Sequence, residues 1–401
     1  WQEVLRGDPH FPVLSARALQ LGKAVEGHAA GCRGNKLAAY LAFGVSSCHE
    51  AVNAKEALER LRMGLWVMIR EGSIRRELEA VAPIKDMSVD LRRMILVSDG
   101  LDPRDVIERG YMDFILQKAI DLGFDPLSAI QMVTLNPAEH FRLDGITGGI
   151  APGKCADIVI ISGLHTIEIE YVISGGRLIV RDGKLMVSPR RVELPHKGLE
   201  GITVDPVDFT IEAKGKGAQR VRVIDQVTGL VTREAILDLF PQNGQIKADP
   251  ERDLLKVSLV NWKGRIFTGL IRGLGMREGA LATSAAWENA GVVVVGVNEE
   301  DMARAVNRVF ELGGGIVLVA RGQPLAELPL PIGGMIADLP IEEVARRLRE
   351  IQEKARELGF RFPDAPLTLA TLPSPAIPFL RISEEGLVDL KKGEIVGIMV
   401  P

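Results

Sequence analysis

The fold of the first part of this chain is decided by the stretch Phe43-Gly44-Val45-Ser46-Ser47-Cys48-His49-Glu50. An apolar run ends there in polar residues, and Asn53-Ala54-Lys55-Glu56 follows a short distance on. Asn53 can accept a hydrogen bond from the amide of Glu56 while the Glu56 side chain reaches back, which is a signature of a helix start. The stretch therefore predicts a β-strand that ends at His49 and an α-helix that begins soon after it.

The same unit recurs on both sides of this stretch. Apolar runs end at His28, His49, Glu71 and Asp99, so the strand-end residues are 21, 22 and 28 positions apart. That spacing is the period of a βα unit and predicts parallel strands. In a closed (β/α)8 barrel the carboxyl ends of the strands form the active-site face. Since only four units are present, we expect residues 1–145 to be the second half of such a barrel.

The pattern changes after residue 145. Short apolar runs separated by Gly and Asp-Gly turns predict a small β-sandwich domain over residues 146–190. Residues 191–206 are expected to be a linker, and residues 207–401 alternate apolar runs with amphipathic segments. The predicted class is therefore α/β: the second half of a TIM-type barrel, a small β domain and a C-terminal mixed α/β domain.

Composition excludes several kinds of partner. The 401 residues carry 49 Lys and Arg against 53 Asp and Glu, a net charge of -4 with no basic stripe, so we expect no nucleic-acid binding. The apolar runs are far shorter than the roughly 20 residues that span a bilayer, so no membrane insertion is expected. Three widely spaced cysteines, Cys32, Cys48 and Cys155, suit a reducing cytoplasm better than a disulfide framework.

Three of the strand-end residues point to a metal site. His28, His49 and Asp99 bring two imidazoles and a carboxylate to successive strand ends, a donor set that suits Zn²⁺, Mn²⁺ or Fe²⁺. A metal-bound water ionises near neutral pH, and a neighbouring carboxylate can take its proton and deliver it to a leaving group. The alternative is that each histidine is a satisfied polar residue at a strand end. The common βα spacing of all three favours the metal site.

The stretch Arg70-Glu71-Gly72-Ser73 is a second candidate site. An Arg–Glu pair at a strand end can bind a polar heterocycle, and Glu71 can donate a proton to a ring nitrogen, which makes the adjacent carbon electrophilic. A structural salt bridge is the alternative. The sequence alone leaves both interpretations open.

Several runs resemble the adenine deaminases of the amidohydrolase superfamily, and the similarity extends over nearly the whole chain. They are Gly27-His28-Ala29, Ser46-Ser47-Cys48-His49-Glu50, Met68-Ile69-Arg70-Glu71-Gly72-Ser73, Thr134-Leu135-Asn136-Pro137-Ala138-Glu139, Gly149-Ile150-Ala151-Pro152-Gly153-Lys154-Cys155-Ala156-Asp157, Gly296-Val297-Asn298-Glu299-Glu300-Asp301-Met302-Ala303, Leu328-Pro329-Leu330-Pro331-Ile332 and Arg381-Ile382-Ser383.

The resemblance implies a metal-dependent hydrolase that converts adenine and water to hypoxanthine and ammonia, a step of purine salvage. It makes His28 and His49 metal ligands and gives Asp99 both a metal-binding and a proton-shuttling role. It also implies that Glu71 is catalytic and that Arg70, Glu71 and Ser73 bind the purine substrate. The remaining ligands of the family, a His-x-His pair and a bridging carboxylate, are expected upstream of Trp1.

The resemblance further implies a divalent metal, with Mn²⁺ expected and Fe²⁺ or Zn²⁺ as alternatives, in a binuclear centre in the complete protein. A cytoplasmic homodimer or higher homo-oligomer is also expected.

This chain departs from the family pattern at three places. The family tends to have Ser-Asp-His-Glu where this chain has Ser47-Cys48-His49-Glu50, and paired aspartates where it has Asp99-Gly100. A His-Asp-Ser-His run is replaced by Trp287-Glu288-Asn289-Ala290. Two alternatives therefore stay open: a related amidohydrolase that acts on another purine or a cyclic amide, and a catalytically silent paralogue that binds a purine.

Overall fold

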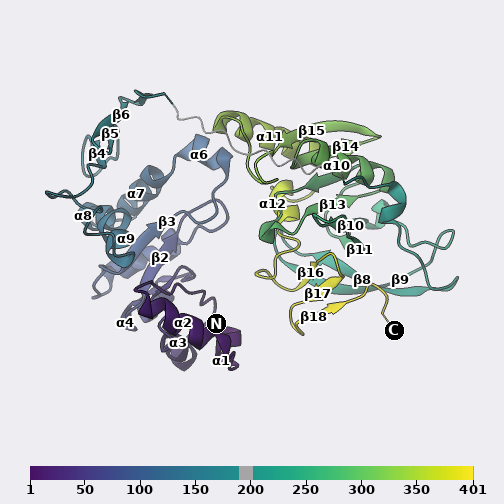
Figure 1. Cartoon of the computed structure of the whole chain (residues 1–401), viewed down its shortest axis with the longest axis horizontal. Helices are drawn as coiled ribbons and strands as arrows, with labels where there is room; N and C mark the ends of the chain where they lie inside the picture. The colour runs from purple at the N-terminus through teal and green to yellow at the C-terminus, as the bar shows by residue number, and fades with distance from the viewer. Residues whose placement is uncertain (189–201, 401) are drawn as a thin grey trace. The chain divides into compact units, whose positions relative to one another are not determined.

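The computed structural model describes residues 1–188 and 202–400 of the chain (Figure 1). The chain divides into two compact units, Trp1–Arg191 and Val192–Pro401. Most of the segment expected to be a linker, residues 191–206, lies outside the described residues.

Parallel strands and helices alternate in the first unit, as the βα spacing predicts. A three-stranded sheet has the order β1-β2-β3, with both pairs parallel. Its strands are β1 (Ser47–Cys48), β2 (Trp66–Arg70) and β3 (Met94–Val97). The segment that ends at His28 lies next to β1 in this sheet, where Val25 and Val45 form one parallel bridge. The carboxyl ends of these strands therefore meet at one edge, in the order in which they occur along the chain.

The helices of this unit begin where the sequence has capping residues. Asn53 Oδ1 accepts from the amide of Glu56 at 3.0 Å, and Asp102 Oδ1 accepts from the amide of Arg104 at 2.7 Å, with Pro103 at the first helical position. The helices are α1 (Gln2–Leu5), α2 (His10–Gln20), α3 (Gly34–Leu41), α4 (Ala54–Arg62), α5 (Leu78–Val81), α6 (Pro103–Arg109), α7 (Met112–Asp121), α8 (Pro126–Val133) and α9 (Leu135–His140). The apolar sides of α4, α7 and α8 pack in one core cluster with β2 and β3.

The small β domain is one sheet in the part of the chain that the structure describes. Its four strands form an antiparallel meander, β4 (Ile158–Ile161), β5 (Ile169–Ser174), β6 (Arg177–Arg181) and β7 (Lys184–Leu185). The expectation of a sandwich is therefore corrected to a single layer. The physical reason is that these short strands make one layer only, and Val159 and Ile160, neighbours on β4 that point to opposite faces, both stay exposed.

An eight-stranded sheet forms the centre of the second unit (Figure 1). Its order is β15-β14-β12-β13-β10-β11-β8-β9, and the β11–β8 pair is its parallel pair. The strands are β8 (Gln219–Gln226), β9 (Thr232–Leu239), β10 (Leu254–Val260), β11 (Ile266–Arg272), β12 (Ala280–Thr283), β13 (Val292–Gly296), β14 (Gly315–Ala320) and β15 (Gln323–Pro329). A separate three-stranded sheet contains β16 (Leu380–Ile382), β17 (Leu387–Asp389) and β18 (Glu394–Val396).

Helices cover both faces of the large sheet, which explains its unbroken apolar runs. Val292 and Val294 of β13 pack with α10 (Glu299–Glu311), while Val293 and Val295 pack in the cluster that contains α11 (Ile341–Glu357) and α12 (Ala365–Ala370). Since successive residues of a strand point to opposite faces, a strand covered on both faces needs apolar residues at every position. No described helix is long and apolar enough to cross a membrane.

The buried side chain of Arg381 joins several backbone segments near the C-terminal end of the second unit. Arg381 on β16 is fully buried and donates hydrogen bonds to four backbone carbonyls: Ile377 at 2.6 Å, Leu230 and Pro378 at 2.8 Å, and Thr371 at 3.3 Å. Burial lowers the pKa of Arg381 to about 10, so the side chain stays charged at neutral pH.

We expect Arg381→Met to lower the free energy of unfolding by about 3 kcal/mol, because four charge-assisted hydrogen bonds are lost and the carbonyls of Ile377 and Leu230 lose the donor that Arg381 supplies. Urea denaturation of the full chain measures this change. The matched control is Arg346→Met on the exposed side of α11, where the ion pairs are solvated and a change below about 0.5 kcal/mol is expected. Equal denaturation midpoints for the two variants would contradict the role given to Arg381.

Candidate active site

The structure brings His28 and His49 together at the edge where the parallel strands end. Their ring centroids are 4.6 Å apart, with an angle of 78° between the ring planes. The parallel bridge between Val25 and Val45 lies a few residues before each histidine and sets the two strand ends side by side. The His28 side chain is largely exposed, and His49 is half-buried.

A third donor joins them that the sequence analysis did not assign. One carboxylate oxygen of Glu50 lies 3.4 Å from Nδ1 of His28, and donor atoms of His28, His49 and Glu50 all lie within 4.8 Å of one another. The sequence signal was the quoted Cys48-His49-Glu50 run, in which Glu50 follows a predicted ligand directly. We call these three residues the His–His–Glu cluster.

The His–His–Glu cluster fits a divalent cation. The second carboxylate oxygen of Glu50, Oε2, is buried and has no hydrogen-bond partner among the described residues. A buried carboxylate oxygen without a partner is costly, and a cation between two imidazoles and this oxygen would remove that cost. Two nitrogen donors and a carboxylate form a set that zinc, manganese or iron accepts.

His49 is in the protonation state that metal binding needs. Burial lowers the pKa of His49 from its ordinary value, and the nearby His28 lowers it further. The charges of Arg70 and Asp99 also act on His49, Arg70 lowering its pKa and Asp99 raising it. The net result is a lowered pKa, so His49 is neutral at neutral pH and its lone pair is available to a cation.

Asp99 lies beside this group without being a member of the His–His–Glu cluster. Its carboxylate accepts a hydrogen bond from Nη1 of Arg70 at 3.2 Å, and its side chain is 42% exposed. The residue has a φ of 56°, a left-handed conformation that Asp and Asn adopt more readily than most residues. The turn after β3 thus presents Asp99 at the strand edge, next to Arg70.

Arg70 and Glu71 do not pair with each other. Arg70 donates two hydrogen bonds to Glu77, of 3.2 and 3.0 Å, in addition to the one to Asp99. Glu71 is buried, and one of its oxygens lies 2.6 Å from Nζ of Lys118 while the other accepts from the amide of Leu78 at 3.3 Å. The two residues therefore belong to separate ion-paired groups.

The substrate roles predicted for this stretch remain predictions. For Glu71 to meet a ring nitrogen, its ion pair with Lys118 would have to open. Ser73 is also engaged, because its Oγ accepts from the amide of Asp102 at 2.7 Å. Arg70 is the member of the stretch that contacts a strand-end residue of the candidate site, Asp99.

Comparison with known proteins first defines the class. Residues 20–179, which contain the His–His–Glu cluster and Asp99, match the amidohydrolase family, and residues 229–394 match the adenine deaminase C-terminal domain. An N-acetyl-D-glucosamine-6-phosphate deacetylase from Mycobacterium smegmatis is similar in structure with a TM-score of 0.34 at 16% identity, over 42% of this chain and 51% of that one.

Curated relatives then define the family. The adenine deaminase of Clostridium botulinum (strain 657 / Type Ba4) is 35% identical over 407 residues, which cover 99% of this chain and 68% of that protein. The adenine deaminase of Desulfatibacillum aliphaticivorans is 38% identical over 400 residues, which cover 98% of this chain and 69% of that protein. The chain belongs to the adenine deaminase family. The family resemblance and the predicted fold class, an α/β protein with a TIM-type hydrolase barrel, are thereby confirmed, and a divalent metal cofactor follows from the amidohydrolase match.

Proposed function

We propose that this chain is a metal-dependent aminohydrolase that converts adenine and water to hypoxanthine and ammonia. Family membership over nearly the whole chain supports the reaction. The observation that carries the proposal for the site is the buried, unpartnered Oε2 of Glu50 beside two imidazoles. A substrate-binding protein without metal chemistry would have no need to leave this oxygen unpaired.

The proposal assigns metal binding to the three cluster residues, proton transfer to Asp99 and the orientation of Asp99 to Arg70. His28, His49 and Glu50 would hold the metal, which when bound would act as a Lewis acid and lower the pKa of water. Asp99 takes one proton from the water that attacks the amino-bearing ring carbon and returns it to the departing amine as the carbon–nitrogen bond breaks. The second proton of the water ends on the ring nitrogen next to that carbon, which leaves a carbonyl group in hypoxanthine. Arg70 orients Asp99 through its 3.2 Å hydrogen bond. Adenine and water are consumed, and hypoxanthine and ammonia are formed.

The finer properties of the cofactor and the assembly are also proposals. We propose Mn²⁺ as the metal, with Fe²⁺ or Zn²⁺ as alternatives, because mixed nitrogen and oxygen donors suit all three. We propose a binuclear metal centre, a homodimer or higher homo-oligomer, and a cytoplasmic location in purine salvage.

Ammonia release from a panel of purines and cyclic amides, each supplied with Mn²⁺, tests the function. We expect the highest rate with adenine. Release from another purine or a cyclic amide alone would identify a related amidohydrolase, which the Cys48 and Gly100 departures favour. Purine binding without ammonia release from any compound would identify a silent paralogue and overturn the enzymatic proposal.

A further inference from the structure

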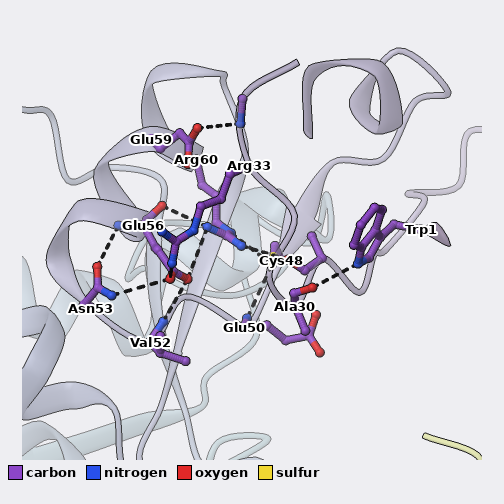
Figure 2. Close-up of polar contacts among 12 residues, drawn as sticks. Trp1, Ala30, Arg33, Cys48, Glu50, Val52, Asn53, Glu56, Glu59 and Arg60 are labelled. Carbon is purple, nitrogen blue, oxygen red and sulfur yellow. Dashed lines mark hydrogen bonds and ion pairs between the residues drawn. The ribbon is translucent and has the colours of Figure 1, made fainter. Parts of the chain in front are cut away.

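A fully buried arginine contacts residues that are next in the chain to His28 and His49. Arg60 is on α4 and has no exposed surface. Its guanidinium donates hydrogen bonds to the carbonyl of Ala29 at 2.9 Å, to Sγ of Cys48 at 3.3 Å and to the carbonyl of Glu56 at 3.1 Å (Figure 2). Burial of a guanidinium costs free energy unless its surroundings compensate the charge, and here the compensation comes from these acceptors.

Two of these acceptors are direct neighbours of the candidate metal ligands. Ala29 follows His28 in the chain, and Cys48 precedes His49. Among the described residues, the backbones of the two strand ends pair further back, at Val25 and Val45, and the Ser47 hydroxyl donates to the Glu26 carboxylate. The planar, rigid guanidinium of Arg60 therefore bridges the two segments at the residues next to the two histidines.

Helix α4 also holds the segment after His28 at two further points. Glu56 is buried and forms an ion pair with Arg33, and its other oxygen lies 3.7 Å from Nη1 of Arg60. Glu59 accepts a hydrogen bond from the amide of Gly34 at 2.8 Å. Figure 2 shows the Glu50 carboxylate pointing away from this network, so this carboxylate takes no part in the network.

We propose that Arg60 is a positioning residue of the candidate metal centre: by bonding to Ala29 and Cys48 it holds His28 and His49 at the separation that a shared cation needs. The proposal rests on the function proposed above and adds a residue to it. A thiol is a weak acceptor. A carboxylate at position 48 would instead form a charge-assisted hydrogen bond with Arg60.

Two measurements on the full chain test the proposal, cobalt titration and crystal structures without added metal. In Arg60→Met we expect the affinity for Co²⁺, followed by its visible absorption, to fall by roughly 10- to 100-fold, as for other residues that orient metal ligands. We expect the crystal structure of this variant to show the two rings further apart than the 4.6 Å between their centroids here. Its thermal unfolding midpoint is expected to fall, because the buried carboxylate of Glu56 loses one of its two cationic neighbours and Cys48 and Ala29 lose a donor. The ring separation and the Co²⁺ affinity of the folded variant are therefore the measurements that test positioning.

Arg62→Met is the matched control, since Arg62 is exposed on the same helix. It is expected to leave both the Co²⁺ affinity and the ring separation unchanged. Cys48→Asp is expected to bind Co²⁺ at least as tightly as the unchanged chain. If Arg60→Met does not fold, Cys48→Ala removes one acceptor with a small change in volume and is expected to weaken Co²⁺ binding severalfold.

Unchanged affinity and ring separation in Arg60→Met, or in Cys48→Ala where the first variant does not fold, would overturn the positioning role while leaving the proposed function intact. Failure of the unchanged chain to bind Co²⁺ would count against the proposed metal centre. The crystal structures would in that case still decide whether Arg60 sets the separation of the two rings.

Discussion

Adenine turnover is expected to fall by roughly a thousandfold or more when Asp99 is replaced by Asn, while the fold is retained. The carboxylate of Asp99 is the proposed carrier of the proton between water and the departing amine, and an amide cannot accept that proton near neutral pH. The hydrogen bond from Arg70 can be kept by the amide oxygen, so the geometry of the turn does not depend on the charge. Steady-state ammonia release with Mn²⁺ measures the effect.

The backbone of Asp99 makes Asn the right substitution. At a φ of 56° an alanine would add backbone strain to the loss of the carboxylate, whereas Asn adopts this conformation about as readily as Asp. Asp182 offers a matched control, because it has a φ of 48° and lies exposed in the small sheet. Asp182→Asn should leave turnover unchanged. Turnover near that of the unchanged chain in Asp99→Asn would show that another group moves the proton.

The spacing of the strand-end residues was enough to predict that the strands are parallel and lie in chain order, and that the side chains of His28 and His49 lie close together. Both follow from local rules: the βα period places the strand ends at one edge, and capping residues such as Asn53 and Asp102 mark where the helices begin. Neither rule depends on contacts between distant parts of the chain. The same rules could not assign Glu50, whose role depends on where its side chain turns after the strand ends.

Strand geometry explains why Arg70 and Glu71 do not act as one pair. Adjacent residues at a strand end tend to point to opposite faces, so Arg70 reaches Asp99 and Glu77 while Glu71 reaches Lys118 on α7. Lys118 is 47 positions away from Glu71, a separation at which sequence pattern gives no pairing signal. Arg60 was missed for the same reason, since its bond to Ala29 joins residues 31 positions apart.

The second large effect is expected on metal content. Replacement of His49 by Ala removes one of the three donors of the His–His–Glu cluster and should lower the metal retained through purification by at least about tenfold. Elemental analysis of the purified chain measures this loss directly and does not require activity. His165→Ala serves as the control, because His165 is exposed and lies outside the cluster.

The pH at which the metal is released independently tests whether His49 is a metal ligand. Metal and protons compete for the imidazole, so a lowered pKa of His49 means that protons displace the metal only below the ordinary histidine value of 6.5. We therefore expect the unchanged chain and His165→Ala to keep their metal as the pH falls to that value and to lose it below. His49→Ala should show no such transition, because little metal is bound at any pH. Full metal content in His49→Ala would mean that the cation is held elsewhere, and the assignment of the strand-end histidines as its ligands would be wrong.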